Sequence, residues 1–244
     1  MDCILLCAGY ATRMYPLTEN FPKPLLEIGG KPLIDYLIDD LAINRLIDRF
    51  VIVSNHKFID HFGKWKLTRK ENIVLLNDGS TANENRLGAV KDIQFAIEKA
   101  EILDDILVLA GDNLLDFSLK AFVDFAAMKN SNAVMRYYES ELTKLKRTGV
   151  AVIDDNDLIV SMKEKPENPK SNWAIPPFYI FTKAYLSEFK KGIESGCKVD
   201  APGEFLEWFA KRNPVYAFQM PGSRIDIGNL EGYEKVKKSY KGIS

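Results

Sequence analysis

The stretch that decides the fold is DCILLCAGYATRMYPLT, residues 2–18. Residues 3–8 form a continuous apolar run, which is typical of a strand buried on both faces of a parallel sheet. Gly9 ends this run, and a loop of small residues leads to a cation, Arg13. In an open parallel sheet, ligands bind beyond the carboxyl ends of the strands, where such a loop leads towards a helix. The stretch therefore predicts an α/β fold and also the place of its ligand.

The first half of the chain continues this alternation of strands and helices. Apolar residues recur with helical spacing over 33–46 and 88–100, and buried apolar runs occupy 50–53, 73–76 and 106–110. Strands that alternate with helices at this spacing form βαβ units. We therefore predict a Rossmann-like fold with a mainly parallel, twisted sheet flanked by helices.

The second half has a different pattern of short strands separated by turn residues. The strands are expected at 133–135, 149–153, 159–162 and 177–181. The sequence DDND at 154–157 is a strong hairpin signal between two of them. This half is expected to add antiparallel strands to the parallel core and to cover one side of its crevice. No segment resembles an appended β-helix, and no additional domain is expected after residue 226.

Composition and charge narrow the class of protein. Hydrophobic residues make up 46% of the chain and charged residues 27%, which is ordinary for a globular protein with a real core. The net charge of −1 argues against a protein held to nucleic acid or to a membrane by bulk electrostatics. Three cysteines without a C-x-x-C pair fit free thiols in a reducing compartment, and the apolar N-terminal run is too short for a signal peptide. We expect a cytoplasmic protein with small-molecule substrates; its oligomeric state is not readable from the sequence.

The first loop has the composition of a phosphate site. Small residues let backbone N–H groups approach a phosphate chain, and Arg13 and Lys23 follow within a dozen residues. Arginine grips phosphate oxygens with two N–H groups, while lysine acts as a point charge. A triphosphate is the natural occupant. The alternative is a tight structural turn in which both cations are surface residues.

The order of these motifs resembles a known family. G-x-x-T-R-x-x-P-L-T at 9–18 is followed by P-K-P-L-L at 22–26 and K-P-L-I at 31–34. This order is similar to that of the sugar-phosphate nucleotidyltransferases (nucleoside-diphosphate-sugar pyrophosphorylases), most closely their glucose-1-phosphate thymidylyltransferase branch. The resemblance covers essentially the whole chain. It implies that the nucleotide is contacted by Ala8, Gly9, Tyr10, Ala11, Thr12, Arg13 and Lys23.

One residue of the loop departs from the family pattern. Ala11 stands where the family usually has a second glycine. An alanine with a negative φ angle would supply the same N–H contact, so we expect only a small adjustment of the loop.

The segment LAGDN at 109–113 suggests a metal site, because its carboxylate follows a buried strand. Mg²⁺ takes one or two protein carboxylates and completes its shell with phosphate oxygens and water. The best second carboxylate lies in RIDIGN at 224–229, which is similar to the family's W-x-D-I-G-T with Arg224 in place of the tryptophan. The resemblance implies that Asp112 and Asp226 share Mg²⁺. Taken alone, each aspartate could be a helix cap or a turn residue.

The acceptor side is expected after residue 160. KEKP at 163–166 looks like the family's E-K-P, which implies that Glu164 holds a sugar hydroxyl and Lys165 grips the acceptor phosphate. The alternative is an exposed charged loop. Asn172 and Trp173 lie in a segment that resembles the sugar-contacting part of the family.

The identity of the acceptor stays open at this point. The glycine that usually precedes the tyrosine of this segment is absent, and IPPFY occupies 175–179. Trp173 or Phe178 could therefore face a sugar, or could stack on a quaternary amine such as that of phosphocholine. Phe178 is expected in the core.

The base is expected at the loop from Asn77 to Gly88. Gly88 and Ala89 look like the family's G-x-A element, in which a glycine lets a base lie against the backbone. Which base is bound is not readable from this loop. We thus expect one nucleotidyltransferase domain over 1–244, with a nucleotide-binding half at 1–115 and an acceptor-binding half at 116–244.

The reaction implied is attack by an acceptor phosphate on the α-phosphorus of an NTP, with Arg13, Lys23 and Asp112 as the catalytic residues. A phosphate dianion is already a nucleophile, so positioning and charge neutralisation suffice. A cytidylyltransferase acting on phosphocholine or on another non-sugar phosphate acceptor is the main alternative. A glycosyltransferase would usually carry Asp-x-Asp where this chain has Gly-Asp-Asn. A catalytically silent regulatory subunit would be expected to lose one of the cations or paired aspartates, and all four are present.

Overall fold

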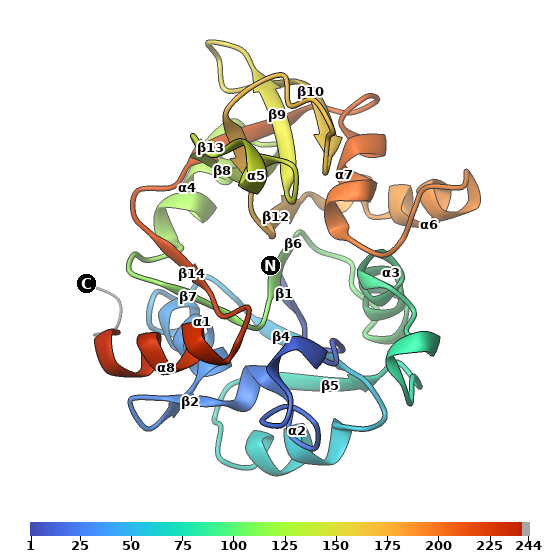
Figure 1. Ribbon diagram of the computed structural model, residues 1–244. Helices are drawn as coiled ribbons and strands as arrows, with labels where there is room; N and C mark the ends of the chain where they lie inside the picture. The colour runs from blue at the N-terminus through green and yellow to red at the C-terminus, as the bar shows by residue number, and fades with distance from the viewer. Residues whose placement is uncertain (241–244) are drawn as a thin grey trace. The chain divides into compact units, whose positions relative to one another are not determined.

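A computed structural model describes residues 1–240 of the chain, apart from the side chain of Asp226. The described chain divides into two compact units. The first unit comprises residues 1–87, 110–120 and the described chain from 221 onward. The second comprises residues 88–109 and 121–220. Figure 1 shows the order of their helices and strands.

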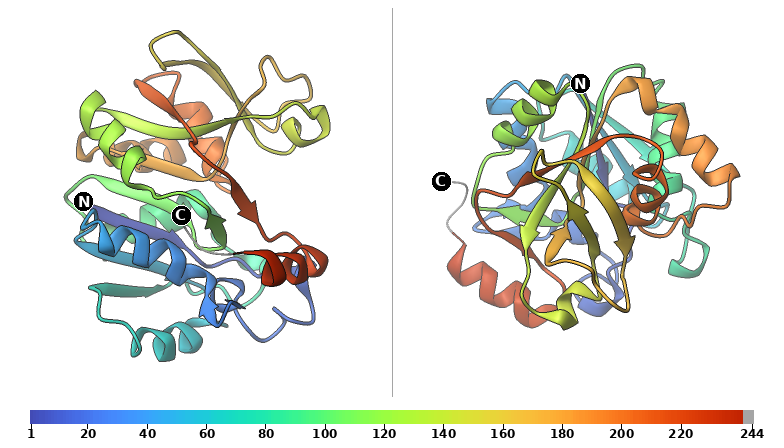
Figure 2. Two further views of the ribbon diagram at one scale, coloured as in Figure 1. Left: turned by 90° about the vertical axis from the view of Figure 1, so that its left-hand side faces the viewer. Right: turned by 90° about the horizontal axis from the view of Figure 1, so that it is seen from above.

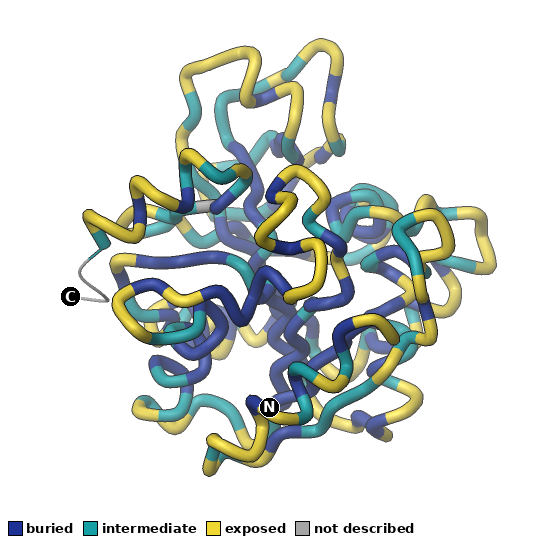
Figure 3. The backbone as a smooth tube through the Cα atoms, turned by 60° about the horizontal axis from the view of Figure 1, so that its bottom comes forward, coloured by how far each residue is buried: buried dark blue, intermediate teal, exposed yellow. Residues whose placement is uncertain are grey.

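The first unit is built on three parallel strands. They are β1 (Asp2–Leu6), β4 (Arg49–Ser54) and β5 (Ile73–Asn77), with β4 pairing to both of the others. Helices α1 (Leu33–Ile43) and α2 (Ile59–Lys66) connect them. Every residue of β4 after the first is buried, and this buried strand core is traced in dark blue in Figure 3. The predicted βαβ alternation of the first half is confirmed.

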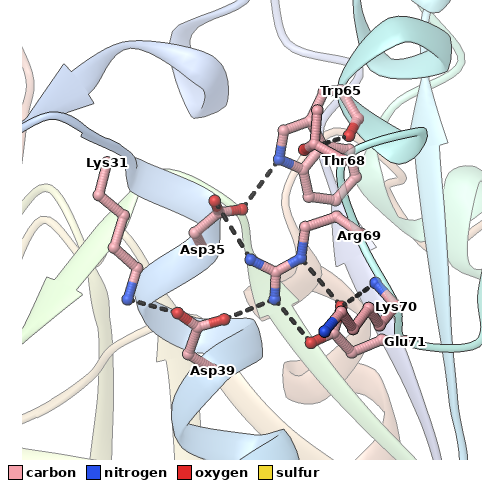
Figure 4. Close-up of polar contacts among 8 residues, drawn as sticks. All are labelled: Lys31, Asp35, Asp39, Trp65, Thr68, Arg69, Lys70 and Glu71. Atoms are coloured by element: carbon pink, nitrogen blue, oxygen red, sulfur yellow. Dashed lines mark hydrogen bonds and ion pairs between the residues drawn. The ribbon is translucent and has the colours of Figure 1, made fainter.

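A group of charged side chains joins the two connecting helices (Figure 4). Asp35 of α1 accepts a hydrogen bond of 2.9 Å from the indole N–H of Trp65 in α2, and it pairs with Arg69 at 3.2 Å. Asp39, one turn further along α1, also pairs with Arg69 and with Lys31. Because Asp35 bonds directly to Trp65, α1 and α2 lie on the same face of the parallel strands.

Two short antiparallel pairs complete the first unit. β7 (Asn113–Leu115) pairs with β14 (Arg224–Asp226), and β2 (Glu27–Ile28) pairs with β3 (Lys31–Pro32). Helix α8 (Leu230–Ser239) follows β14, as the red end of the ribbon in Figure 2 shows. An apolar cluster holds these parts to the first loop, and its buried members are Met14, Leu26, Ile28, Leu33, Leu114, Ile227, Tyr233 and Val236. Residues 227–236, near the end of the described chain, thus pack against the first loop and the segment that follows it.

The strands of the second unit are mainly antiparallel. In spatial order they are β6 (Ile106–Ala110), β12 (Phe178–Phe181), β8 (Asn132–Tyr138), β11 (Trp173–Ile175), β9 (Gly149–Ile153) and β10 (Ile159–Glu164). β13 (Val215–Gln219) runs parallel to β8. The predicted hairpin joins β9 to β10, and the Asp154 carboxylate accepts N–H groups from Asn156 and Leu158 at 2.9 Å each.

Helices flank the strands of the second unit. They are α3 (Ala89–Lys99), α4 (Lys120–Lys129), α5 (Leu142–Leu145), α6 (Ser187–Glu194) and α7 (Pro202–Phe209). Phe181, Phe189 and Phe205 form the aromatic centre of its core, with the last two stacked at 4.0 Å between ring centroids. Phe178 is fully buried, as expected. The α/β fold with added antiparallel strands is confirmed. Of the helices within residues 1–240, none has the length and apolar character needed to cross a membrane.

Candidate active site

The loop after β1 presents a row of unpaired backbone donors. Within residues 1–240, the N–H groups of residues 9–12 donate no hydrogen bond to any other protein atom. The carbonyl groups around them are occupied instead: Asn55 donates to the oxygen of Ala8 at 3.0 Å, and the Thr18 hydroxyl donates to that of Ala11 at 2.8 Å. Successive free N–H groups of this kind form an anion-binding concavity. The loop is therefore held in a shape that suits a phosphate chain.

Ala11 corrects one prediction about this loop. Its φ and ψ angles are 46° and 42°, in the left-handed region, and not the negative φ expected from the sequence. This region costs an L-residue roughly 1 kcal/mol, which explains why glycine suits the position. The short helical turn that begins at Thr12 and the bond from Thr18 keep the alanine in this conformation.

The other residues of the first unit that are predicted to bind the nucleotide differ in whether their side chains are exposed. Ala8 and Tyr10 are buried, and the Tyr10 ring lies 6.0 Å from that of Phe58, so both face the core and only their backbone is available. Thr12 is exposed. Asn77, at the end of β5, is exposed and its amide lies 3.0 Å from a ring nitrogen of His56.

The two central charged residues of the predicted site are in direct contact. The ammonium nitrogen of Lys23 lies 2.6 Å from a carboxylate oxygen of Asp112. Lys23 is almost fully buried, whereas about a third of the Asp112 side chain is exposed. Arg13 is exposed and has no ion pair within the described residues. The site therefore holds one internally paired cation and one cation that is available to a ligand.

These residues line one pocket of about 190 Å³ in the first unit. Five predicted site residues contribute to its wall, namely Gly9, Ala11, Arg13, Lys23 and Asp112. The volume is smaller than that of pockets which enclose whole drug-sized ligands, about 300–1,000 Å³. It is suited to the phosphate groups of a ligand.

The backbone after β6 must approach the end of β1 closely. A Cβ atom added to Gly111 would lie 2.5 Å from the sulfur of Cys7, so only glycine fits there. Burial, followed by the nearby charge of Asp112, holds the pKa of the Cys7 thiol well above its usual value. Cys7 therefore packs as an inert thiol beneath the pocket.

The chemistry of Asp112 fits a magnesium ion, although only part of the predicted metal site is described. Asp226 lies in β14, but its side chain is outside the described part of the structure. The described residues contain no cluster of three or more acidic, histidine or cysteine ligands. Mg²⁺ needs only one or two carboxylates when phosphate oxygens complete its shell. Asp112 faces a phosphate-sized pocket and meets that requirement.

Gly88 belongs to the second unit and has a structural reason to be glycine. Its φ angle is 90°, and an added Cβ atom would lie 2.5 Å from the carbonyl oxygen of Val199. The N–H groups of Ala89 and Val90 donate to the carbonyls of Asp200 and Val199. The start of α3 is thus capped by this segment. Contact of Gly88 with a base stays a prediction.

Glu164, at the end of β10, is a largely buried carboxylate in the second unit. Its side chain lies against Gly203 at the start of α7, where an added Cβ atom would come within 2.0 Å of a carboxylate oxygen. Burial raises the pKa of Glu164, Lys165 opposes the rise, and Glu204 and Glu207 add to it. No hydrogen bond from the described residues reaches this carboxylate. It is available to donors of a ligand.

Lys165 follows as an exposed residue with a left-handed backbone, φ 45°. Its N–H donates to the carbonyl of Thr148 at 3.1 Å, one position beyond the paired Glu164 and Gly149. The Glu164 side chain lies against the start of α7, whereas the Lys165 side chain is exposed and its charge acts on the Glu164 carboxylate.

Strand register decides how the other predicted acceptor residues lie. Glu164 is opposite Gly149, which is opposite Ile175, and Trp173 is two residues before Ile175. Because alternate residues of a strand share a face, Trp173 and Glu164 lie on the same face of the sheet. Asn172 precedes Trp173 and its amide donates to the carbonyl of Glu139 at 2.8 Å. It serves the link between β8 and β11.

A comparison with protein families matches residues 2–242 to the nucleotidyl transferase model, which is nearly the whole chain. The chain belongs to the nucleotidyl transferase family. The relatives within the family span several branches, and the thymidylyltransferase branch is not singled out among them.

Curated relatives match over most of this chain. It is 28% identical to a glucose-1-phosphate adenylyltransferase of Fervidobacterium nodosum, over 94% of this chain and 59% of that protein. It is 32% identical to the bifunctional protein GlmU of Methanococcus aeolicus, over 93% of this chain and 51% of the relative. It is 25% identical to the UTP–glucose-1-phosphate uridylyltransferase AglF of Haloferax volcanii, over 98% and 96%. The chain thus spans between half and three fifths of the first two relatives.

Solved structures of nucleotidyl transferases share the fold. A UDP-glucose pyrophosphorylase complexed with UDP-glucose aligns with a TM-score of 0.82 at 23% identity, over 98% of this chain and 97% of that one. The apo form of a UDP-glucose pyrophosphorylase aligns with a TM-score of 0.81 at 22% identity, over 98% and 97%.

Three residues that hold the pocket in shape were not singled out from the sequence. Asn55 and Thr18 fix carbonyls of the loop after β1, and Asn113 donates to the second carboxylate oxygen of Asp112 at 3.2 Å. Asn55 and Asn113 share a signal that could have found them, because each follows a buried apolar strand closely. Polar residues at that edge of a sheet face its ligands.

Proposed function

We propose that this nucleotidyl transferase transfers a nucleoside monophosphate from an NTP to a sugar-1-phosphate, forming an NDP-sugar and releasing pyrophosphate. The observation that carries the proposal is the pocket in which free N–H groups of the first loop meet Arg13, Lys23 and Asp112. These groups neutralise phosphate charge, which nucleotidyl transfer between phosphates requires. They supply no general base, and none is needed because the attacking phosphate is already a nucleophile.

The chemistry follows from these groups. An oxygen of the acceptor phosphate forms a bond to the α-phosphorus as the bond from that phosphorus to the bridging oxygen of pyrophosphate breaks. The N–H groups of residues 9–12 hold phosphate oxygens in place, and Arg13 neutralises the departing pyrophosphate. Lys23 pairs with Asp112. Its ammonium group would neutralise charge on the α-phosphate. Mg²⁺ held by Asp112, with Asp226 as the second expected ligand, would supply further positive charge when bound.

On the acceptor side we propose that the Glu164 carboxylate accepts a hydrogen bond from a sugar hydroxyl. Its carboxylate is largely buried and receives no hydrogen bond within residues 1–240, so a ligand hydroxyl would supply a missing donor. Lys165, exposed beside it, would hold the acceptor phosphate. Trp173 shares the face of Glu164 and would bound the sugar.

Phosphocholine is a weaker candidate as the acceptor because the ring that would bind its quaternary amine already holds a cation. The guanidinium of Arg136 lies 4.7 Å from the centre of the Trp173 ring, and Tyr138 packs edge-on against the same side chain. A second cation on Trp173 would have to share the ring with Arg136.

Pyrophosphate release from the purified protein with Mg²⁺ tests the proposal. Five NTPs are each combined with several sugar-1-phosphates and with phosphocholine. The resemblance to the thymidylyltransferase branch makes dTTP with glucose-1-phosphate one pair to test. The relatives named as an adenylyltransferase and a uridylyltransferase make ATP and UTP the competing nucleotides. Release with any NTP and sugar-1-phosphate supports the class, and EDTA should abolish it. Release only with phosphocholine, or none from folded protein, would refute it.

A further inference from the structure

The carboxylate of Asp112 is held from both sides. One oxygen accepts a hydrogen bond of 2.6 Å from the ammonium of Lys23, and the other accepts one of 3.2 Å from the side-chain amide of Asn113. Asn113 is itself 1% exposed, and its amide also donates to the carbonyl of Ala110 at 3.1 Å. The remaining atom of that amide, Oδ1, accepts a hydrogen bond of 2.7 Å from the guanidinium of Arg224. These contacts form one chain within the first unit, from Lys23 through Asp112 and Asn113 to Arg224.

Arg224, together with the Ala110 carbonyl and the Asp112 carboxylate, fixes which way the Asn113 amide points. An arginine can only donate hydrogen bonds, so it requires the oxygen of the amide on its side. With the amide reversed, its NH₂ group would face the guanidinium, and its oxygen would face the carbonyl of Ala110 and the carboxylate of Asp112. All three contacts would then be repulsive. The pairing of β14 with β7 sets Arg224 opposite Leu115, two residues beyond Asn113, which lets its long side chain reach back.

We infer that Arg224 is a positioning residue for the metal-binding carboxylate, and that it acts on Asp112 through Asn113. Arg224 stands where the resembled family has tryptophan, which has no comparable fork of N–H donors. Partners of metal ligands commonly change metal affinity by 10- to 100-fold when they are removed. The inference rests on the proposed function only in assuming that Asp112 binds Mg²⁺ beside phosphate groups.

The test measures binding without turnover. The affinity for inorganic pyrophosphate is determined by calorimetry with Mg²⁺ and with EDTA, and the ratio of the two dissociation constants reports the contribution of the metal. In Arg224→Met we expect this ratio to fall about 10-fold while the metal-free affinity stays the same. Arg224→Lys, which keeps a donor for Asn113, should recover part of the ratio. Arg212→Met, which removes an exposed arginine of the second unit, is the matched control.

A double-mutant cycle separates this role from a general effect on folding. If Arg224 acts through Asn113, Arg224→Met should lower the ratio no further in an Asn113→Ala background. Three outcomes would overturn the inference and leave the proposed function standing. They are additive losses in the double variant, an equal loss of affinity with and without metal, and an unchanged ratio in folded Arg224→Met. A wild-type protein that binds pyrophosphate without any effect of Mg²⁺ would overturn the metal role of Asp112, and the inference with it. Should Asn113→Ala fail to fold, the comparison of Arg224→Met with Arg224→Lys still decides.

Discussion

Lys23 and Asp112 are 89 positions apart in the chain, yet the ammonium nitrogen of one lies 2.6 Å from a carboxylate oxygen of the other. The contact ties the motif after β1 to the motif after β6 at the wall of one pocket. A nearly buried lysine needs such a partner, because an unpaired charge there would lose its hydration without compensation. The same pair places a carboxylate and a cation where phosphate groups are proposed to react.

Removing the charge of Asp112 should lower catalysis strongly, and it should also destabilise the fold because nearly buried Lys23 keeps only a neutral partner. Asp112→Asn keeps an oxygen for Lys23 but lacks the charge that binds a metal, and we expect turnover to fall by about 10²- to 10³-fold or more. Asp155→Asn, in the exposed turn between β9 and β10, is the control and should leave turnover unchanged. Steady-state pyrophosphate release measures both variants. Near-normal turnover in Asp112→Asn would remove this residue from the site.

Arg13 should affect catalysis and leave stability unchanged. It is exposed and has no ion pair within residues 1–240, so Arg13→Gln should leave the Tm as it is. Because the guanidinium is proposed to neutralise the departing pyrophosphate, kcat should fall by roughly 10²- to 10³-fold. Arg45→Gln changes another exposed arginine, after α1, and should leave both the Tm and kcat unchanged. Equal kcat values for the two variants would contradict the role of Arg13.

Ala11→Gly tests the conformational cost in the phosphate loop. Glycine adopts the left-handed region without the penalty of roughly 1 kcal/mol that alanine carries, but it loses about 0.5–1 kcal/mol more entropy on folding. The free energy of unfolding should therefore change little or rise slightly. Ala127→Gly, at an exposed position in α4, relieves no left-handed conformation and adds only the entropy that glycine loses on folding. It should lower the free energy of unfolding by about 0.5–1 kcal/mol. Urea unfolding compares them, and equal losses would refute the argument.

Gly111→Ala should be poorly tolerated because its Cβ atom would come within 2.5 Å of the Cys7 sulfur. We expect a loss of about 1–3 kcal/mol in the free energy of unfolding, typical of overpacking. The double variant with Cys7→Ala, which removes the sulfur, should recover part of the loss. Gly63→Ala in α2 meets no atom within 4 Å and should be neutral or stabilising. A Gly111→Ala protein as stable as Gly63→Ala would show that the approach is not close.

Glu164 should make stability depend on pH in a defined direction. Burial raises its pKa in the folded protein, so the fold favours the protonated form and is destabilised as the pH rises through that pKa. Glu164→Gln, which is neutral at every pH, should be more stable than the wild type at pH 8, and the difference should vanish by about pH 4. Urea midpoints at the two pH values measure this.

The exposed Glu167→Gln, three residues away, should show no such change. A Glu164→Gln protein less stable than the wild type at pH 8 would mean that the carboxylate has a donor which favours its charge. The same variant should bind the acceptor more weakly at pH 8, because the amide cannot accept a sugar hydroxyl with a full negative charge.

The sequence alone determined the alternation of elements and the place of the proposed phosphate site. The apolar run at 3–8 and the glycine after it predict a buried strand and a ligand loop because both signals are local. The order of Arg13, Lys23 and Asp112 named the cations and the carboxylate that line the pocket. The hairpin at 154–157 was predicted for the same reason, since turn chemistry depends on adjacent residues.

Tertiary structure decided what depends on contacts between distant segments. The left-handed φ of Ala11 is kept by a bond from Thr18, and the sequence led to the opposite sign. The pairing of Lys23 with Asp112 and the bond from Arg224 to Asn113 follow from how strands and loops pack. A residue pattern reports the period of one segment and the chemistry of its neighbours. Which segments meet, and how closely, is set by the burial of apolar surface over the whole unit, and no local pattern carries that information.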